Sequence, residues 1–136
     1  MRILGLSFLK ISADRKEKYT ERPTLNADIK VDNVEKESVP NSSDELLRVY
    51  FTFKLLYQPN IATIEIKGCL VILPNEEEKK KISKLKDKNL PNELKIPIFN
   101  FLFEKCSLKS IELEDQLGLP IHIPFPRLES QEKKNN

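Results

Sequence analysis

The chain of 136 residues has little of what catalytic and ligand-binding sites are commonly built from. It contains one histidine, two cysteines and no tryptophan. Its three glycines, Gly5, Gly68 and Gly118, are too far apart to form a glycine-rich phosphate loop. No apolar run approaches the roughly 18 residues that a membrane-spanning helix requires. These absences argue against a nucleotide-binding enzyme and against membrane insertion.

The chain also lacks an excess of charge of one sign. Charged residues make up 32% of the chain, yet the formal net charge is only +2. A dedicated nucleic-acid-binding domain carries a strongly basic surface, so this balance argues against nucleic acid as a partner. The first residues lack the small-residue cleavage site of a secretory signal. We therefore expect a cytoplasmic protein in which Cys69 and Cys106 are isolated apolar residues, a disulfide between them being the less favoured alternative.

The few residues able to carry chemistry are poorly placed for catalysis. His122, the only histidine, stands between two isoleucines, and we expect it to be structural or exposed. One imidazole and two separated thiols cannot supply a zinc site at familiar spacing. The acids Glu76–Glu78 are expected to form a solvated helix start, and Glu112, Glu114 and Asp115 to be solvated as well. No nucleophile, base and oxyanion donor occur together, so the sequence predicts no enzyme, no cofactor and no metal.

Alternating hydrophobicity predicts four strands in the first half of the chain. Residues 3–12 carry apolar side chains on both faces, so we expect this strand to be covered on both sides. Residues 24–35 alternate more cleanly and precede a loop around Pro40. The segments ELLRVYFTFKLLYQ and IATIEIKGCLVIL flank a turn at residues 58–60, which predicts an antiparallel hairpin.

After the fourth strand the periodicity becomes helical. Asn75, followed by acidic residues, predicts the start of a short, superficial helix. The main helix is predicted over residues 92–117, with Pro91 at its start and Gly118 as its left-handed stop. We expect it to pack on one face of the sheet through four apolar side chains: Ile98, Phe101, Leu102 and Leu108.

The last part of the chain is rich in proline and apolar residues. Pro120, Pro124 and Pro126 alternate with apolar side chains, which favours an extended backbone. The sequence therefore predicts one α+β domain over residues 1–128: a four-stranded antiparallel sheet, a short helix, a long helix packed on the sheet and an extended Pro-rich C-terminal segment. Residues 129–136 are polar and are expected to be a disordered tail.

The order of these elements, and the prolines and glycines that bound them, resemble those of the SecB family of protein-export chaperones. LKISADR resembles the family's first strand, ELLRVYFTFKLLY its third, and IATIEIKGCLVIL, which contains Gly68, its fourth. The long helix and the segment that follows it resemble those of the family in the positions of proline and glycine. These are Pro91 and Asn92 at the start of the helix, then Pro97, then Gly118 at its end, followed by residues 119–126.

The resemblance implies a chaperone that assembles as a homodimer or a dimer of dimers and binds unfolded or partly folded protein clients. Two departures bear on how it would work. SecB proteins are acidic and this chain is slightly basic, which puts docking on the SecA motor ATPase in doubt. The family's terminal helix, which helps close its peptide groove, is replaced by a short polar tail after Phe125. SecB-like proteins include chaperones of toxin–antitoxin systems as well as export factors, and fold alone does not choose between them.

The function that follows is that of a SecB-like holdase. The alternatives are a specific adaptor or assembly subunit that keeps the fold, and a small-molecule carrier or weak enzyme. For the holdase we expect an apolar groove for extended peptide. Its lining would combine Phe101 or Phe103 with four residues of the C-terminal segment: Ile121, Ile123, Phe125 and Leu128. The alternative for these side chains is that they seal the segment onto its own core.

Overall fold

The computed structural model of the chain describes residues 1–84 and 90–123. Its elements are, in order, β1 (Arg2–Arg15), β2 (Thr24–Ser38), β3 (Glu45–Gln58), β4 (Ala62–Leu73), α1 (Glu76–Lys84) and α2 (Asn92–Leu117). The predicted α+β class, with an antiparallel sheet followed by a short and a long helix, is confirmed. The part of the predicted extended segment beyond residue 123, and the predicted tail at 129–136, lie outside the described residues.

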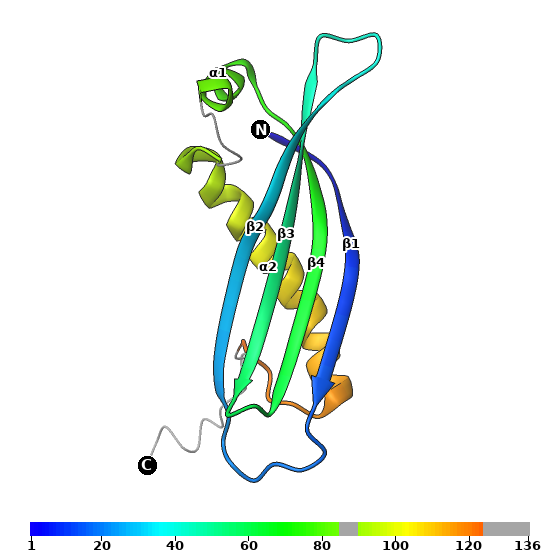
Figure 1. The fold of residues 1–136 in the computed structure, drawn as a ribbon, viewed down its shortest axis with the longest axis vertical. Coiled ribbons are helices and arrows are strands. Elements are labelled where there is room, and N and C mark those ends of the chain that lie inside the picture. The colour runs from blue at the N-terminus through cyan, green and yellow to red at the C-terminus, as the bar shows by residue number, and fades with distance from the viewer. Residues whose placement is uncertain (85–89, 124–136) are drawn as a thin grey trace, which may run out of the picture.

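The four strands form one antiparallel sheet in the order β1-β4-β3-β2 (Figure 1). β2, β3 and β4 follow one another in sequence; β2 pairs with β3 and β3 pairs with β4, and the predicted hairpin corresponds to β3 and β4. β1 pairs with β4, so residues 16–23 must carry the chain across the end of the sheet to β2. This is a Greek-key order with β1 and β2 at the two edges.

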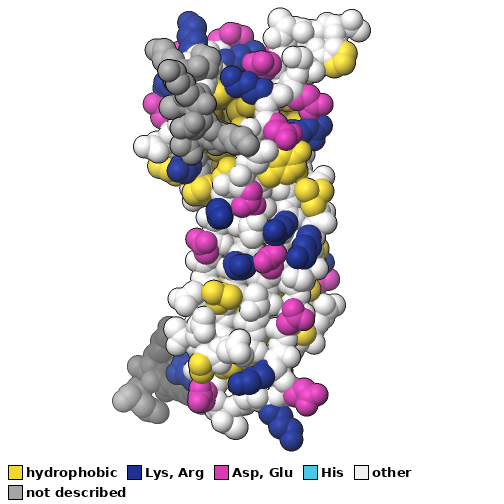
Figure 2. Space-filling model, in the orientation of Figure 1, with side chains coloured by type: hydrophobic (Ala, Val, Ile, Leu, Met, Phe, Trp, Pro, Cys, Tyr) yellow, Lys and Arg dark blue, Asp and Glu magenta, His cyan; other side chains and the backbone are white. Residues whose placement is uncertain are grey.

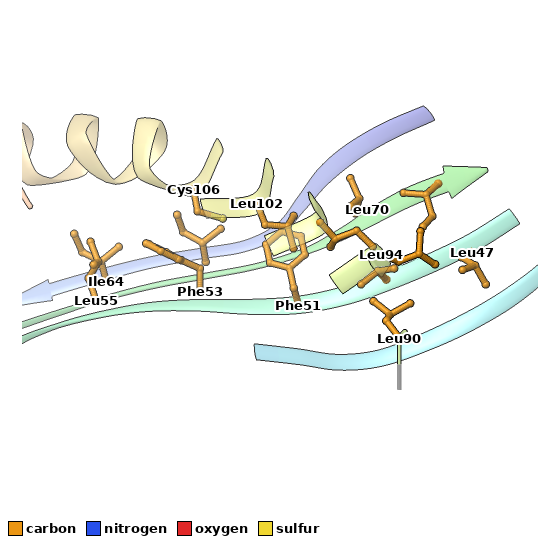
Figure 3. Close-up of a cluster of buried hydrophobic side chains, with 14 of the residues drawn as sticks. Leu47, Phe51, Phe53, Leu55, Ile64, Leu70, Leu90, Leu94, Leu102 and Cys106 are labelled. Carbon is orange, nitrogen blue, oxygen red and sulfur yellow. The ribbon is translucent and has the colours of Figure 1, made fainter. Parts of the chain in front are cut away.

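α2 covers one face of the sheet, which we call the inner face. The side chains of β3 and β4 alternate with a period of two, so that every second one is buried under α2. α2 meets them with residues spaced by four, and Figure 3 shows Leu94, Leu102 and Cys106 directed at Phe51, Phe53 and their neighbours. Each large apolar side chain buried there contributes about 1.5–3 kcal/mol.

The predicted contacts of α2 are only partly right. Ile98 and Leu102 are fully buried, and Phe101 is half-buried. Leu108, however, is 58% exposed. It lies two residues beyond Cys106, about 200° further round the helix, and therefore points away from the buried stripe.

β1 is an edge strand, and a single chain does not cover both its faces as expected. Its register with β4 shifts at two places, leaving Leu4 and Leu9 as extra residues. Their side chains are 43% and 63% exposed. The two bulges change the alternation, so that the side chains paired with the inner-face residues of β4 are Ile3, Leu6, Phe8 and Ile11.

α1 begins as predicted. The Asn75 side chain accepts a hydrogen bond from the Glu78 N–H at 2.9 Å, and the Glu78 carboxylate accepts one from the Asn75 N–H at 2.9 Å. This reciprocal pair is a capping box. Lys81 of α1 forms an ion pair with Glu93 in the first turn of α2, which ties the two helices together.

Candidate functional site

α2 crosses the inner face diagonally, from the β2 side at its start to the β1 side at its end (Figure 1). The Phe103 ring meets Phe53 of β3 edge-on, with ring centroids 5.9 Å apart. At the far end, Arg15 of β1 donates a hydrogen bond to the Leu117 carbonyl oxygen at 2.8 Å. A helix about 10 Å wide cannot cover four strands spaced about 4.8 Å apart. Apolar inner-face side chains therefore remain half-buried on both flanks of α2.

One of these flanks lies between α2 and β2. There Leu25 and Ile29 of β2 are half-buried, and they pair with Tyr57 and Phe53 of β3. Phe103 is 41% exposed on the same flank. We call the apolar area formed by Leu25, Ile29 and Phe103 the flank surface.

The segment after α2 returns to this flank. Gly118, with φ of 65°, ends α2 in the left-handed region, and the Leu119 N–H closes the turn on the Glu114 carbonyl oxygen at 2.9 Å. Glu114 lies eleven residues, or about three turns, beyond Phe103, and so on the same side of the helix. His122 is hydrogen-bonded to Glu114, which brings Ile121 to the side of α2 that carries Phe103.

The residues proposed from the sequence as a groove lining are only partly brought together. Phe103, on the flank surface, is 41% exposed, Ile121 is 38% exposed, and Ile123 is half-buried. Phe101 lies on the opposite flank, because residues two apart on a helix point about 200° apart, and Lys105 Nζ lies 5.6 Å from its ring. Phe125 and Leu128 lie outside the described residues.

A buried polar cluster holds the end of α2, and the sequence did not predict it. Glu114, expected to be solvated, is fully buried. One of its carboxylate oxygens accepts hydrogen bonds from the Tyr57 hydroxyl and from the His122 backbone N–H, the latter at 2.9 Å. Its other oxygen lies 2.7 Å from His122 Nδ1. Glu114 is buried because the buried positions of α2 recur every four residues, and this series extends to 114.

The hydroxyl and the imidazole of this cluster are shielded from solvent. Burial raises the pKa of Tyr57 above its ordinary value, and the Glu114 carboxylate raises it further, so the hydroxyl remains a proton donor. The His122 side chain is only 5% exposed, which fits the structural role expected for it. Its Nε2 has no hydrogen-bond partner in the part of the chain that the structure describes.

The outer face of the sheet, opposite α2, is polar and carries both signs of charge. Figure 2 shows basic and acidic side chains interspersed over it. Glu65 lies at the centre of one such group, with the ammonium nitrogens of Lys10 and Lys54 each 3.6 Å from its carboxylate and that of Lys67 at 4.0 Å. Exposed ion pairs of this kind contribute little stability. Their mixed signs do not form the one-sided basic patch that nucleic acid requires.

Other kinds of site can be assessed for residues 1–84 and 90–123. Within these ranges no three His, Cys, Asp or Glu side chains gather where they could hold a metal ion. The helices described there are too short or too polar to cross a membrane. Cys69 and Cys106 are free and buried, and burial raises the pKa of the Cys106 thiol to about 12.

The sequence and the structure were compared with known proteins. No protein-family model matches the sequence, and no curated protein sequence matches it. Among solved structures, the chain is similar to a SecB-like chaperone of Mycobacterium tuberculosis, determined in complex with a peptide from the HigA1 antitoxin. The two share 16% sequence identity over 95% of this chain and 91% of that one, with a TM-score of 0.49.

Proposed function

We propose that the protein is a cytoplasmic, SecB-like holdase that binds unfolded or partly folded polypeptides and has no catalytic activity of its own. The observation that carries the proposal is the incomplete cover of the inner face by a single helix. Phe103 and Ile121 keep 41% and 38% of their side chains exposed beside half-buried strand residues. Exposed aromatic and aliphatic side chains attract the apolar residues of an unfolded chain without demanding a particular sequence.

The position of β2 supports an extended client. β2 is an edge strand, and within the described residues its outer edge pairs with no other strand. Its inner-face residues Leu25 and Ile29 belong to the flank surface. A client segment running along β2 would form main-chain hydrogen bonds with this edge and place alternate side chains on the flank surface.

The opposite edge supports a homo-oligomer. β1 presents three apolar side chains, Leu4, Leu9 and Ile11, with 42–63% of each exposed. An apolar edge strand is prone to aggregate unless another strand or subunit covers it. We propose a homodimer, or a dimer of dimers, whose contacts use β1 and the long helix in an isologous arrangement.

The test is suppression of aggregation of several unrelated, chemically denatured proteins. Phe103→Ser is expected to weaken suppression several-fold, because it removes the most exposed aromatic of the flank surface. The matched control is Leu56→Ser, the same kind of change on the outer face, where Leu56 pairs with Asn26. Suppression that Phe103→Ser leaves intact, or loses no more than Leu56→Ser does, would exclude the flank surface. Binding of a single folded partner, with no effect on denatured proteins, would instead favour an adaptor.

A further inference from the structure

Within the described residues, the polar contacts of the five residues after Gly118 converge on two residues. The Leu119 N–H donates to the Glu114 carbonyl oxygen at 2.9 Å, and the His122 N–H to the Glu114 carboxylate at 2.9 Å. The Tyr57 hydroxyl oxygen lies 3.2 Å from the Pro120 carbonyl oxygen and donates to the same carboxylate. Glu114 therefore fastens both ends of this short segment, and Tyr57 connects it to the sheet.

The pattern of donors defines the state of the cluster. An ionised carboxylate only accepts hydrogen bonds, and two donors, the Tyr57 hydroxyl and the His122 N–H, already point at one Glu114 oxygen. The 2.7 Å contact between His122 Nδ1 and the other oxygen is a hydrogen bond to the carboxylate in the tautomer that carries its proton on Nδ1. Other groups nearby are Arg15, bound to the Leu117 carbonyl, and Tyr19, under the Arg15 guanidinium.

Apolar burial of this segment is limited. Leu119 is 6% exposed and belongs to the core, whereas Ile121 is 38% exposed. The side chain that turns inward between the two isoleucines is the imidazole of His122. Ile121 and Ile123 lie on either side of it, so the position of His122 determines where both of them are displayed.

We propose that Tyr57, Glu114 and His122 form a latch that docks residues 119–123 on the end of α2 and opens as a local unit while the sheet stays folded. The Nδ1–H bond of His122 to Glu114 closes the latch, and His122 and Glu114 are its positioning residues. Opening releases Ile121 and Ile123 from the side of α2. The latch is a property of the fold and stands whether or not the protein binds clients.

The test is hydrogen exchange of the full chain measured by mass spectrometry, with three substitutions at His122. His122→Asn keeps an N–H donor close to the position of Nδ1, His122→Leu keeps apolar bulk without a donor, and His122→Ala keeps neither. Because a buried hydrogen bond is worth about a factor of ten in an equilibrium, Leu and Ala are expected to speed exchange in residues 118–123 roughly tenfold. Asn is expected to stay within about twofold of the wild type.

A second pair of variants tests the acceptor side of the latch, Glu114. Glu114→Leu removes both acceptor oxygens and should open the segment, whereas Asp115→Leu makes the same kind of change at the exposed neighbouring position and should not. Three results would overturn the latch: His122→Leu protecting the segment as well as His122→Asn, equal exchange in all His122 variants, or a rise in β3 and β4 exchange that matches the rise in residues 118–123. Since His122 lies beyond the end of α2, its variants leave the sheet and α2 able to form even if Glu114→Leu does not fold.

Discussion

Gly68 lies in β4, between β1 and β3. In β4 it pairs with Phe8 of β1 on one side and with Phe51 of β3 on the other. A Cβ added there would stand 2.6 Å from Phe51 Cζ and 2.6 Å from the Ser7 carbonyl oxygen. The Phe51 ring is a buried core side chain, and the Ser7 oxygen belongs to the backbone of β1. Neither can give way without a shift of β1 or of the packing under α2.

The substitution Gly68→Ala is therefore expected to destabilise the protein strongly for a single methyl group. Overpacking of a tight core typically costs about 1–3 kcal/mol, and the backbone contact places this site near the upper end, at about 2–3 kcal/mol. For a domain of this size about 3–5 °C of melting temperature corresponds to each kcal/mol. The melting temperature should therefore fall by roughly 6–15 °C, measured by circular dichroism at fixed protein concentration.

Gly5→Ala is the matched control, because the added Cβ at Gly5 of β1 meets no heavy atom within 4 Å. It should change stability by less than about 1 kcal/mol, in either direction. A second substitution, Phe51→Leu, in the Gly68→Ala background should restore only part of the loss, since the Ser7 oxygen remains. The steric argument fails if Gly68→Ala melts within about 2 °C of the wild type, or if Gly5→Ala is equally harmful.

Three further predictions concern other parts of the molecule. Burial raises the pKa of Glu78, but the hydrogen bond with the Asn75 backbone helps bring it below its ordinary value on balance. A group with a depressed pKa stabilises the fold at pH values above its unfolded-state pKa of about 4.3, and this stabilisation is lost as the pH falls. Glu78→Gln should therefore lower the urea midpoint at pH 7 and hardly change it at pH 3. An equal loss of the urea midpoint at both pH values would contradict this. Leu9→Lys at the β1 edge should reduce the mass measured by sedimentation to that of a smaller species at micromolar concentration, while Leu56→Lys on the outer face should not. If the wild-type protein sediments as a monomer, the proposal of a homo-oligomer is refuted. The Cys106 thiol, with its raised pKa and buried side chain, should resist alkylation at pH 8 until urea unfolds the chain, and rapid labelling of the native protein would count against its burial.

Local periodicity was sufficient to predict the elements of this fold. The period-two segments became β1 to β4, and the helix predicted over residues 92–117 has those bounds. The orientation of β1 could not be predicted in the same way. Leu4 and Leu9 are apolar, so nothing in their chemistry distinguishes a bulged residue from a buried one. The register with β4 decides which residues of β1 face inward, and that register depends on pairing between residues about sixty positions apart.

Glu114 shows a different limit of sequence reasoning. The spacing of four that runs from Leu94 through Cys106 to residue 114 was readable in the sequence and placed this carboxylate on the buried stripe. Residue type argued the other way, because Glu is almost never fully buried unless it is paired. Its partners are Tyr57, on a distant strand, and His122, which reaches it only after Gly118 reverses the chain. A carboxylate on a buried stripe that ends beside a left-handed glycine, with a histidine soon after, is therefore a pattern that predicts a docked segment, and substitutions at residue 122 test it directly.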